Sequence, residues 1–235
     1  MSKLVHYFFD VDGTLTKPRG KMDSSFTMSF LEWMENKSVF LVAGSDIDKV
    51  KQQLPYSVIS RCAGIFCSMG NQFWIKDDLV YEKDWKCGID LLNDLRSFRQ
   101  DSLYANKKGN WLEHRTGMIN FSIAGRDSNL EQREEYHKWD TENQERLNIV
   151  KSLSKKYDHL DFRIGGKISI DINPKGNNKS QASQWIRENL GGKIIFFGDS
   201  CSPEGNDYDI YVDVKENDGE SYWVDSPSDT LKLLK

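Results

Sequence analysis

The sequence predicts an α/β protein whose core is a doubly wound parallel sheet, with an α+β domain inserted into that core. Three unbroken apolar runs, at residues 4–9, 39–43 and 194–197, are each followed by glycine or aspartate. Unbroken apolar runs are typical of strands that are buried on both faces of a parallel sheet. Helical spacing over residues 26–36 separates the first two runs, and such strand–helix–strand alternation favours a doubly wound sheet. The carboxyl ends of these strands should meet at one edge, where ligands bind in such folds.

The middle of the chain follows a different pattern, with amphipathic helices beside alternating strands. Helices are expected over residues 89–98 and 130–153, and strands over 111–115, 118–123 and, bent at two glycines, 163–172. The charge-dense run 131–146 is expected to be a solvated helix face. We therefore predict a discontinuous core at residues 1–79 and 177–235 and an inserted domain at residues 80–176.

Composition excludes several classes of function. The 235 residues include 32 Lys and Arg and 36 Asp and Glu, so the net charge is −4, which argues against broad binding of nucleic acid or an anionic membrane. No apolar run approaches the roughly 18 residues of a membrane span, and Asp10 interrupts the start too early for a signal peptide. Cys62, Cys67, Cys87 and Cys201 lack metal-binding spacing, so we expect reduced thiols and a cytoplasmic protein.

The strongest chemical signal is the run Asp10-Val11-Asp12-Gly13-Thr14 directly after the first strand. Two carboxylates so close together are costly to bury unless a divalent cation compensates them, and Mg²⁺ prefers such oxygen ligands. Gly13 allows a sharp turn whose N–H groups can face a phosphate. An Asp-Gly pair alone is usually an ordinary turn, but the whole run after a buried strand favours a metal and phosphate site.

Other polar residues follow the later strands. Ser45 could hold a phosphoryl oxygen, although by itself it is better explained as the N-cap of a helix at residues 46–54. Lys179 could neutralise a transferring phosphoryl group or lie on the surface. Asp199 could complete a metal site opposite Asp10, and Asp207 could be a further ligand, a support or a loop cap.

Together these four segments resemble, in their order, the haloacid dehalogenase (HAD) superfamily of phosphotransferases. In that superfamily the first aspartate attacks phosphorus to form an aspartyl-phosphate, and the second transfers the proton of the leaving or attacking oxygen. The resemblance implies these catalytic roles for Asp10 and Asp12, and a HAD-like core with an inserted cap. It also implies Mg²⁺, held by Asp10, Asp12, Asp199 and Asp207.

Further stretches resemble the eukaryotic-type phosphomannomutases in collinear order over essentially the whole chain. They are Pro18-Arg19 after the first motif, Arg115-Thr116-Gly117-Met118-Ile119-Asn120, Gly125-Arg126, Glu131-Gln132-Arg133, Gly165-Gly166-Lys167-Ile168-Ser169-Ile170-Asp171, and the acidic loop at residues 196–207. The chain departs from that family at Ser68-Met69-Gly70, where Glu-Asn-Gly is usual, and at Glu204, where glycine is common.

The resemblance implies a set of substrate-binding residues. Arg115, Arg126 and Arg133 would clamp the phosphate distal to the nucleophile, since the planar guanidinium binds phosphate oxygens in pairs. Ser169 and Asp171, on one face of a strand, would bind sugar hydroxyls. The same comparison adds Arg19, Ser45 and Lys179 as substrate contacts, and a second cation site near Asp213, Tyr211 and Glu216. Without it, each arginine would be interpreted as a surface or salt-bridge residue.

The activity implied is that of a Mg²⁺-dependent hexose-phosphate mutase, which interconverts mannose 6-phosphate and mannose 1-phosphate in mannose activation for glycan synthesis. A hexose 1,6-bisphosphate would be both intermediate and activator, and a homodimer would form through the cap. The alternative is a HAD-type sugar-phosphate phosphatase, in which water attacks the phospho-enzyme. A third hypothesis is a catalytically silent sensor of sugar phosphates.

Overall fold

In the computed structural model, which describes residues 4–234, the three apolar runs form adjacent strands at the centre of a seven-stranded sheet. They are β1 (Val5–Phe9), β2 (Ser38–Val42) and β10 (Lys193–Gly198), and β1 is parallel to both neighbours. The complete order is β11-β10-β1-β2-β3-β4-β5. The predicted parallel core is therefore confirmed.

Helices cover both faces of this sheet, as a doubly wound fold requires. The helices α1 (Ser24–Trp33), α2 (Ile47–Gln53), α3 (Tyr56–Ile59) and α9 (Pro227–Leu233) lie on one face, and α7 (Ser180–Asn189) and α8 (Tyr208–Glu216) lie on the other. Successive side chains of β1 alternate between the two resulting hydrophobic clusters, with Phe9 in one and Phe8 in the other. We call this sheet and its helices the core.

The core extends further along the chain than we predicted. After β3 (Gly64–Cys67) and a 3₁₀ turn, η1 (Ser68–Gly70), the chain forms an antiparallel hairpin of β4 (Gln72–Ile75) and β5 (Asp78–Glu82) at the sheet edge, opposite the edge strand β11 (Glu220–Trp223). The boundary predicted between residues 79 and 80 falls inside β5, so it moves beyond Glu82. The sequence of β5 hides this strand because its side chains are mostly exposed and it shows no buried apolar run.

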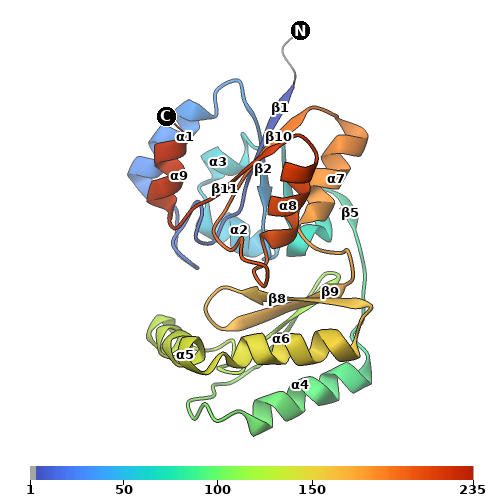
Figure 1. Ribbon diagram of the computed structural model, residues 1–235. Helices are drawn as coiled ribbons and strands as arrows, with labels where there is room; N and C mark the ends of the chain where they lie inside the picture. Colours follow the sequence, from blue (N-terminus) through green and yellow to red (C-terminus); the bar gives the residue numbers. More distant parts are fainter. Residues whose placement is uncertain (1–3, 235) are drawn as a thin grey trace.

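A second layer, which we call the cap, lies over the carboxyl ends of the core strands (Figure 1). Its antiparallel sheet has the order β6 (Leu112–Arg115), β7 (Met118–Phe121), β9 (Ser169–Pro174), β8 (Leu160–Gly165). The helices α4 (Ile89–Asp101), α5 (Leu130–Asn143) and α6 (Glu145–Lys156) pack on the apolar face of this sheet, so its polar face is turned toward the core.

The region predicted as one helix over residues 130–153 is instead two helices, because Gln144 has a positive φ of 52° that ends α5. The predicted solvated face at residues 131–146 is only partly solvated. Asp140 and Arg146 are buried and form an ion pair with an O–N distance of 2.7 Å, and Arg133 is buried as well. Pairing makes this burial of charge tolerable. No helix within residues 4–234 is both long and apolar enough to cross a bilayer.

Candidate active site

Three of the predicted acidic residues meet at the carboxyl ends of β1 and β10. Asp10 follows β1, Asp199 follows β10, and Asp207 immediately precedes α8. One carboxylate oxygen from each lies within 4.8 Å of the others. Asp10 and Asp207 are buried, and Asp199 is half-buried. We call these three residues the acidic cluster.

Lys179 supplies the positive charge that faces this cluster. It lies fully buried just before α7, and its Nζ is 2.5 Å from Asp10 Oδ1 and 2.7 Å from Asp207 Oδ1. A surface position for Lys179 is therefore excluded. Burial raises the pKa of Asp10 to about 7 despite Lys179, and burial together with Asp10 raises the pKa of Asp199. One lysine thus leaves the acidic cluster short of positive charge.

The acidic cluster fits a hard divalent cation such as Mg²⁺. Asp10 Oδ2 is buried and accepts no hydrogen bond within the described part of the chain. Gly13 has a φ of +93°, and a Cβ there would lie 2.2 Å from Asp199 Oδ2, so only glycine permits this close approach. Three convergent carboxylates, one with an unpartnered oxygen, are the donor set that Mg²⁺ prefers.

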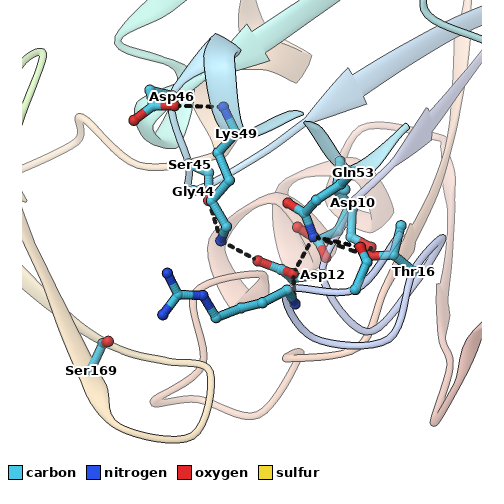
Figure 2. A network of polar contacts seen from close by, with 12 residues as sticks. Asp10, Asp12, Thr16, Gly44, Ser45, Asp46, Lys49, Gln53 and Ser169 are labelled. Carbon is cyan, nitrogen blue, oxygen red and sulfur yellow. Dashed lines mark hydrogen bonds and ion pairs between the residues drawn. The ribbon is translucent and has the colours of Figure 1, made fainter. Parts of the chain in front are cut away.

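Asp12, which we predicted as a fourth metal ligand, contributes no carboxylate oxygen to the acidic cluster. Its carboxylate instead accepts hydrogen bonds from the backbone N–H of Arg19 (2.5 Å), Lys49 Nζ (2.9 Å) and Gln53 Nε2 (2.7 Å) (Figure 2). Burial opposes ionisation of Asp12, but the Lys49 ion pair and these hydrogen bonds outweigh it and hold the pKa below its usual range. The two aspartates therefore have different environments.

Lys49 and Gln53 are site residues that sequence reasoning missed. They lie one turn apart on α2, and Lys49 reaches both Asp12 and Ser45 Oγ, which is 3.0 Å from its Nζ (Figure 2). The N-cap of α2 is Asp46, whose Oδ1 accepts the N–H of Lys49, so the capping role that we favoured for Ser45 is wrong. In the sequence, the i, i+4 spacing of Lys49 and Gln53 after the second strand could have indicated that both lie on one side of a helix next to the site.

The polar face of the cap sheet brings together Arg115, Arg126 and Ser169. Arg115 Nε and Arg126 Nε each lie 2.7 Å from a different oxygen of Glu113, a residue that sequence reasoning also missed. Arg126 Nη1 donates to Ser169 Oγ at 2.7 Å, and Arg115 Nη1 donates to the carbonyl of Gly44 in the core at 2.6 Å. The cap arginines therefore lie directly over the core motifs.

Arg133 lies beside the same group. It is buried, and its guanidinium donates to the carbonyls of Ser128 and Arg126, each at 2.7 Å. Burial, together with repulsion from Arg19 and Arg126, lowers the pKa of Arg133 to about 10. Arg19 is exposed and comes from the core loop after Asp12, so cationic side chains from both layers converge.

Asp171 connects the two layers. Its carboxylate accepts hydrogen bonds from Asn120 Nδ2 of the cap (2.6 Å) and Asn206 Nδ2 of the core (3.3 Å), and it lies 3.9 Å from Arg115 Nη1. It is almost fully buried. Asp171 thus lies between the cap arginines and the core loop that carries Asp207.

The Asp213 side chain, near which we predicted a second cation, is held by other residues of the core. Arg187 Nη1 and Nη2 each donate to one oxygen of Asp213 at 2.8 Å, and Ser183 Oγ donates as well. A guanidinium already neutralises the Asp213 carboxylate, so this side chain is not a free ligand, and the cation site expected near it stays a prediction. The pair joins α7 to α8 within the core.

Comparison with known proteins gives consistent results. A family model described as eukaryotic phosphomannomutase matches residues 27–235. The chain is 36% identical to a phosphomannomutase of Triticum aestivum, over 97% of this chain and 92% of that protein. It is 34% identical to a phosphomannomutase of Dendrobium officinale, over 97% and 91%.

Solved structures show the same fold at low identity. A haloacid dehalogenase-like hydrolase from Bacteroides thetaiotaomicron has a TM-score of 0.60 at 12% identity, covering 99% of this chain and 98% of that one. A HAD subclass IIB sugar phosphatase has a TM-score of 0.59 at 14% identity, covering 97% of each chain. The HAD-like core with its cap is therefore confirmed.

Proposed function

The chain belongs to the eukaryotic phosphomannomutase family, and from that membership we propose that it interconverts mannose 6-phosphate and mannose 1-phosphate. The observation that carries this proposal is the pairing of two anion sites across the interface between the layers. The acidic cluster and Lys179 lie in the core, and Arg115 of the cap, beside Arg126, reaches the Gly44 carbonyl of the core. A hexose with a phosphate at each end needs both sites at once.

Asp10 is the proposed nucleophile. One of its oxygens attacks phosphorus, the bond from phosphorus to the sugar oxygen breaks, and an aspartyl-phosphate forms. Lys179 holds Asp10 Oδ1 and fixes the direction of the carboxylate. When bound, Mg²⁺ would be held by Asp10, Asp199 and Asp207 and would supply neutralisation of the phosphoryl charge.

Asp12 is the proposed proton carrier. Its ionised carboxylate, held by Lys49 and Gln53, accepts the proton of the sugar hydroxyl that attacks the phosphorylated Asp10. The product is a hexose 1,6-bisphosphate, which turns so that its other phosphate reaches Asp10. Transfer of that phosphoryl group leaves an alkoxide, which takes the proton back from Asp12. Added bisphosphate would act as activator because it charges Asp10.

The phosphatase alternative has less support. A phosphatase needs only water at the phospho-enzyme, whereas Arg115 and Arg126 provide a second cationic site for a distal phosphate. The named relatives are phosphomannomutases. A silent sensor would need neither a buried lysine at Asp10 nor an orphaned carboxylate oxygen beside it.

A product assay over hexose 6-phosphates, with Mg²⁺ and catalytic bisphosphate present, tests the proposal. We expect mannose 1-phosphate to form faster than inorganic phosphate, and Asp10→Asn to abolish turnover while hexose-phosphate binding survives. Asp77→Asn, which changes an exposed carboxylate paired with Lys51, is the matched control and should keep full activity. Faster release of inorganic phosphate would favour the phosphatase, and mutase activity in Asp10→Asn would exclude Asp10 as nucleophile.

We further propose a homodimer formed through the cap, in the cytoplasm. Large apolar side chains, Ile89, Leu103 and Leu130, are exposed on the cap, and their burial between two copies would support pairing. All four cysteines carry free thiols, which is typical of proteins in a reducing compartment. Light scattering at micromolar concentration would measure the mass, and a monomer there would exclude the dimer.

A further inference from the structure

A carboxylate lies in the middle of the cap arginines. Glu113 Oε1 is 2.7 Å from Arg115 Nε, and its Oε2 is 2.7 Å from Arg126 Nε, so one side chain binds both guanidinium groups. Glu113 is half-buried on β6 and is ionised at neutral pH because the arginines hold its pKa at about 2, although burial opposes this. A negative charge here repels an incoming phosphate, so its presence needs a reason.

The hydrogen bonds that Arg115 and Arg126 already make explain why Glu113 is there. A guanidinium has five N–H donors. Arg115 uses Nε on Glu113 and one Nη1 proton on the Gly44 carbonyl, and Arg126 uses Nε on Glu113 and one Nη1 proton on Ser169. The Nη2 groups of both arginines donate no hydrogen bond within residues 4–234. The Nη2 group of each arginine is therefore free to donate hydrogen bonds to a ligand.

The third arginine is fixed without Glu113. Arg133 donates from Nε to the Ser128 carbonyl and from Nη2 to the Arg126 carbonyl. Backbone atoms thus orient Arg133. Arg115 and Arg126 are each held by Glu113 at Nε and by one contact at Nη1, with the Gly44 carbonyl and Ser169 Oγ respectively. Among residues 4–234, Glu113 is the one group that accepts a hydrogen bond from the Nε of both arginines.

We propose that Glu113 is a positioning residue, which holds Arg115 and Arg126 by their Nε atoms so that their Nη2 ends are directed at the distal phosphate of the bound hexose phosphate. This rests on the proposed function for the identity of the ligand. The carboxylate weakens the local positive potential but fixes the two arginines in advance of binding. Pre-orientation reduces the entropy that rotamer-rich side chains lose when they are immobilised on a ligand.

Glu113→Gln separates this role from that of a simple counter-ion, because the two predict opposite signs. Loss of a negative charge alone would strengthen phosphate binding. Loss of orientation would weaken it, since an amide accepts from only one arginine. We expect the dissociation constant for inorganic phosphate, without Mg²⁺, to rise about tenfold. The readout is the NMR shift of the Arg115 and Arg126 Nε–H signals during phosphate titration.

Two further variants separate the position of the Glu113 carboxylate from its charge. Glu142→Gln removes the same charge from an exposed position on α5 and should leave phosphate affinity unchanged. Glu113→Asp keeps the charge and should recover part of the affinity. In the mutase assay, Glu113→Gln should raise KM about tenfold with little change in kcat.

Unchanged or tighter phosphate binding by Glu113→Gln would overturn the inference, as would a wild-type protein whose Arg115 and Arg126 signals do not respond to phosphate. The proposed mutase activity stands or fails separately in the product assay. A protein that binds phosphate as expected but lacks turnover would refute the activity and leave the role of Glu113 standing.

Discussion

At the scale of single residues, Gly13 determines whether the acidic cluster can form. Its φ of +93° turns the chain sharply after Asp12, and the space of its missing side chain is filled by the Asp199 carboxylate. A methyl group there would overlap Asp199 Oδ2 at 2.2 Å. The residue that shapes the turn therefore also places a carboxylate of the acidic cluster that follows a different strand.

We expect Gly13→Ala to fold but to lose at least tenfold in Mg²⁺ affinity, because Asp199 must move away from Asp10 and Asp207. Calorimetric titration with Mg²⁺ measures this, and mutase activity should fall with it. Gly176→Ala is the control, since Gly176 has a φ of +82° and nothing within 4 Å of an added Cβ. It should cost about 1 kcal/mol of stability from backbone strain and leave Mg²⁺ binding intact. Equal losses of affinity in both variants would contradict the steric argument.

At the scale of elements, the cap sheet separates its two faces by simple alternation. Glu113 pairs across the sheet with Asn120, Asn120 with Asp171, and Asp171 with Arg163, so a polar row crosses all four strands on the face toward the core. The alternate residues, such as Phe121 and Ile172, pack against the cap helices. Ion pairs on this face are therefore at least partly buried, and their protonation should affect stability.

Acid should destabilise the protein partly through Glu113. Arg115 and Arg126, acting against burial, hold its pKa at about 2, below the ordinary 4.5. Because the folded pKa is the lower one, the stabilisation is complete above about pH 4.5 and is lost as the pH falls toward 2. Between pH 5 and pH 2 the wild type should lose about 1–2 kcal/mol more stability than Glu113→Gln, after allowance for partial exposure. Thermal melts followed by circular dichroism would show it, and parallel pH profiles would refute it.

Sequence patterns predicted the elements whose signal is local. Unbroken apolar runs identified β1, β2 and β10, and the polar residues after them led to Asp10, Asp199 and Asp207. Lys49 and Glu113 escaped because their roles depend on which surfaces meet. The i, i+4 spacing of Lys49 and Gln53 places both on one side of a helix, but it does not show what that side contacts. The place of Asp12 outside the acidic cluster escaped for the same reason: its two side-chain partners, Lys49 and Gln53, lie on α2, more than thirty residues along the chain.

At the scale of the whole molecule, the cap is fastened to the core beside the acidic cluster. Arg163 of β8 donates from Nε and Nη2 to the two oxygens of Asp209 on α8, at 2.8 and 2.6 Å. The adjacent N–H of Ile164 donates to the Glu204 carbonyl at 2.6 Å. Asp207 lies between these two contacts, just before α8. Contacts that hold the cap against the core therefore also support the loop that carries Asp207. In the proposed mechanism the bisphosphate turns between the two layers, which would require the cap to open.

Breaking this fastening should shift the protein toward an open form. Arg163→Met removes a bidentate ion pair whose side chains are only 21% and 17% exposed, and a loss of about 1–2 kcal/mol would lower the ratio of closed to open molecules roughly 5- to 30-fold. Small-angle X-ray scattering should show a larger radius of gyration without ligand, and KM should rise because binding must then also close the cap. Arg187→Met is the matched control, since it breaks an equally bidentate pair with Asp213 inside the core. That variant should lower Tm and leave the radius unchanged. An unchanged radius in Arg163→Met, or an equal expansion in both variants, would mean that the Arg163–Asp209 pair does not control the position of the cap.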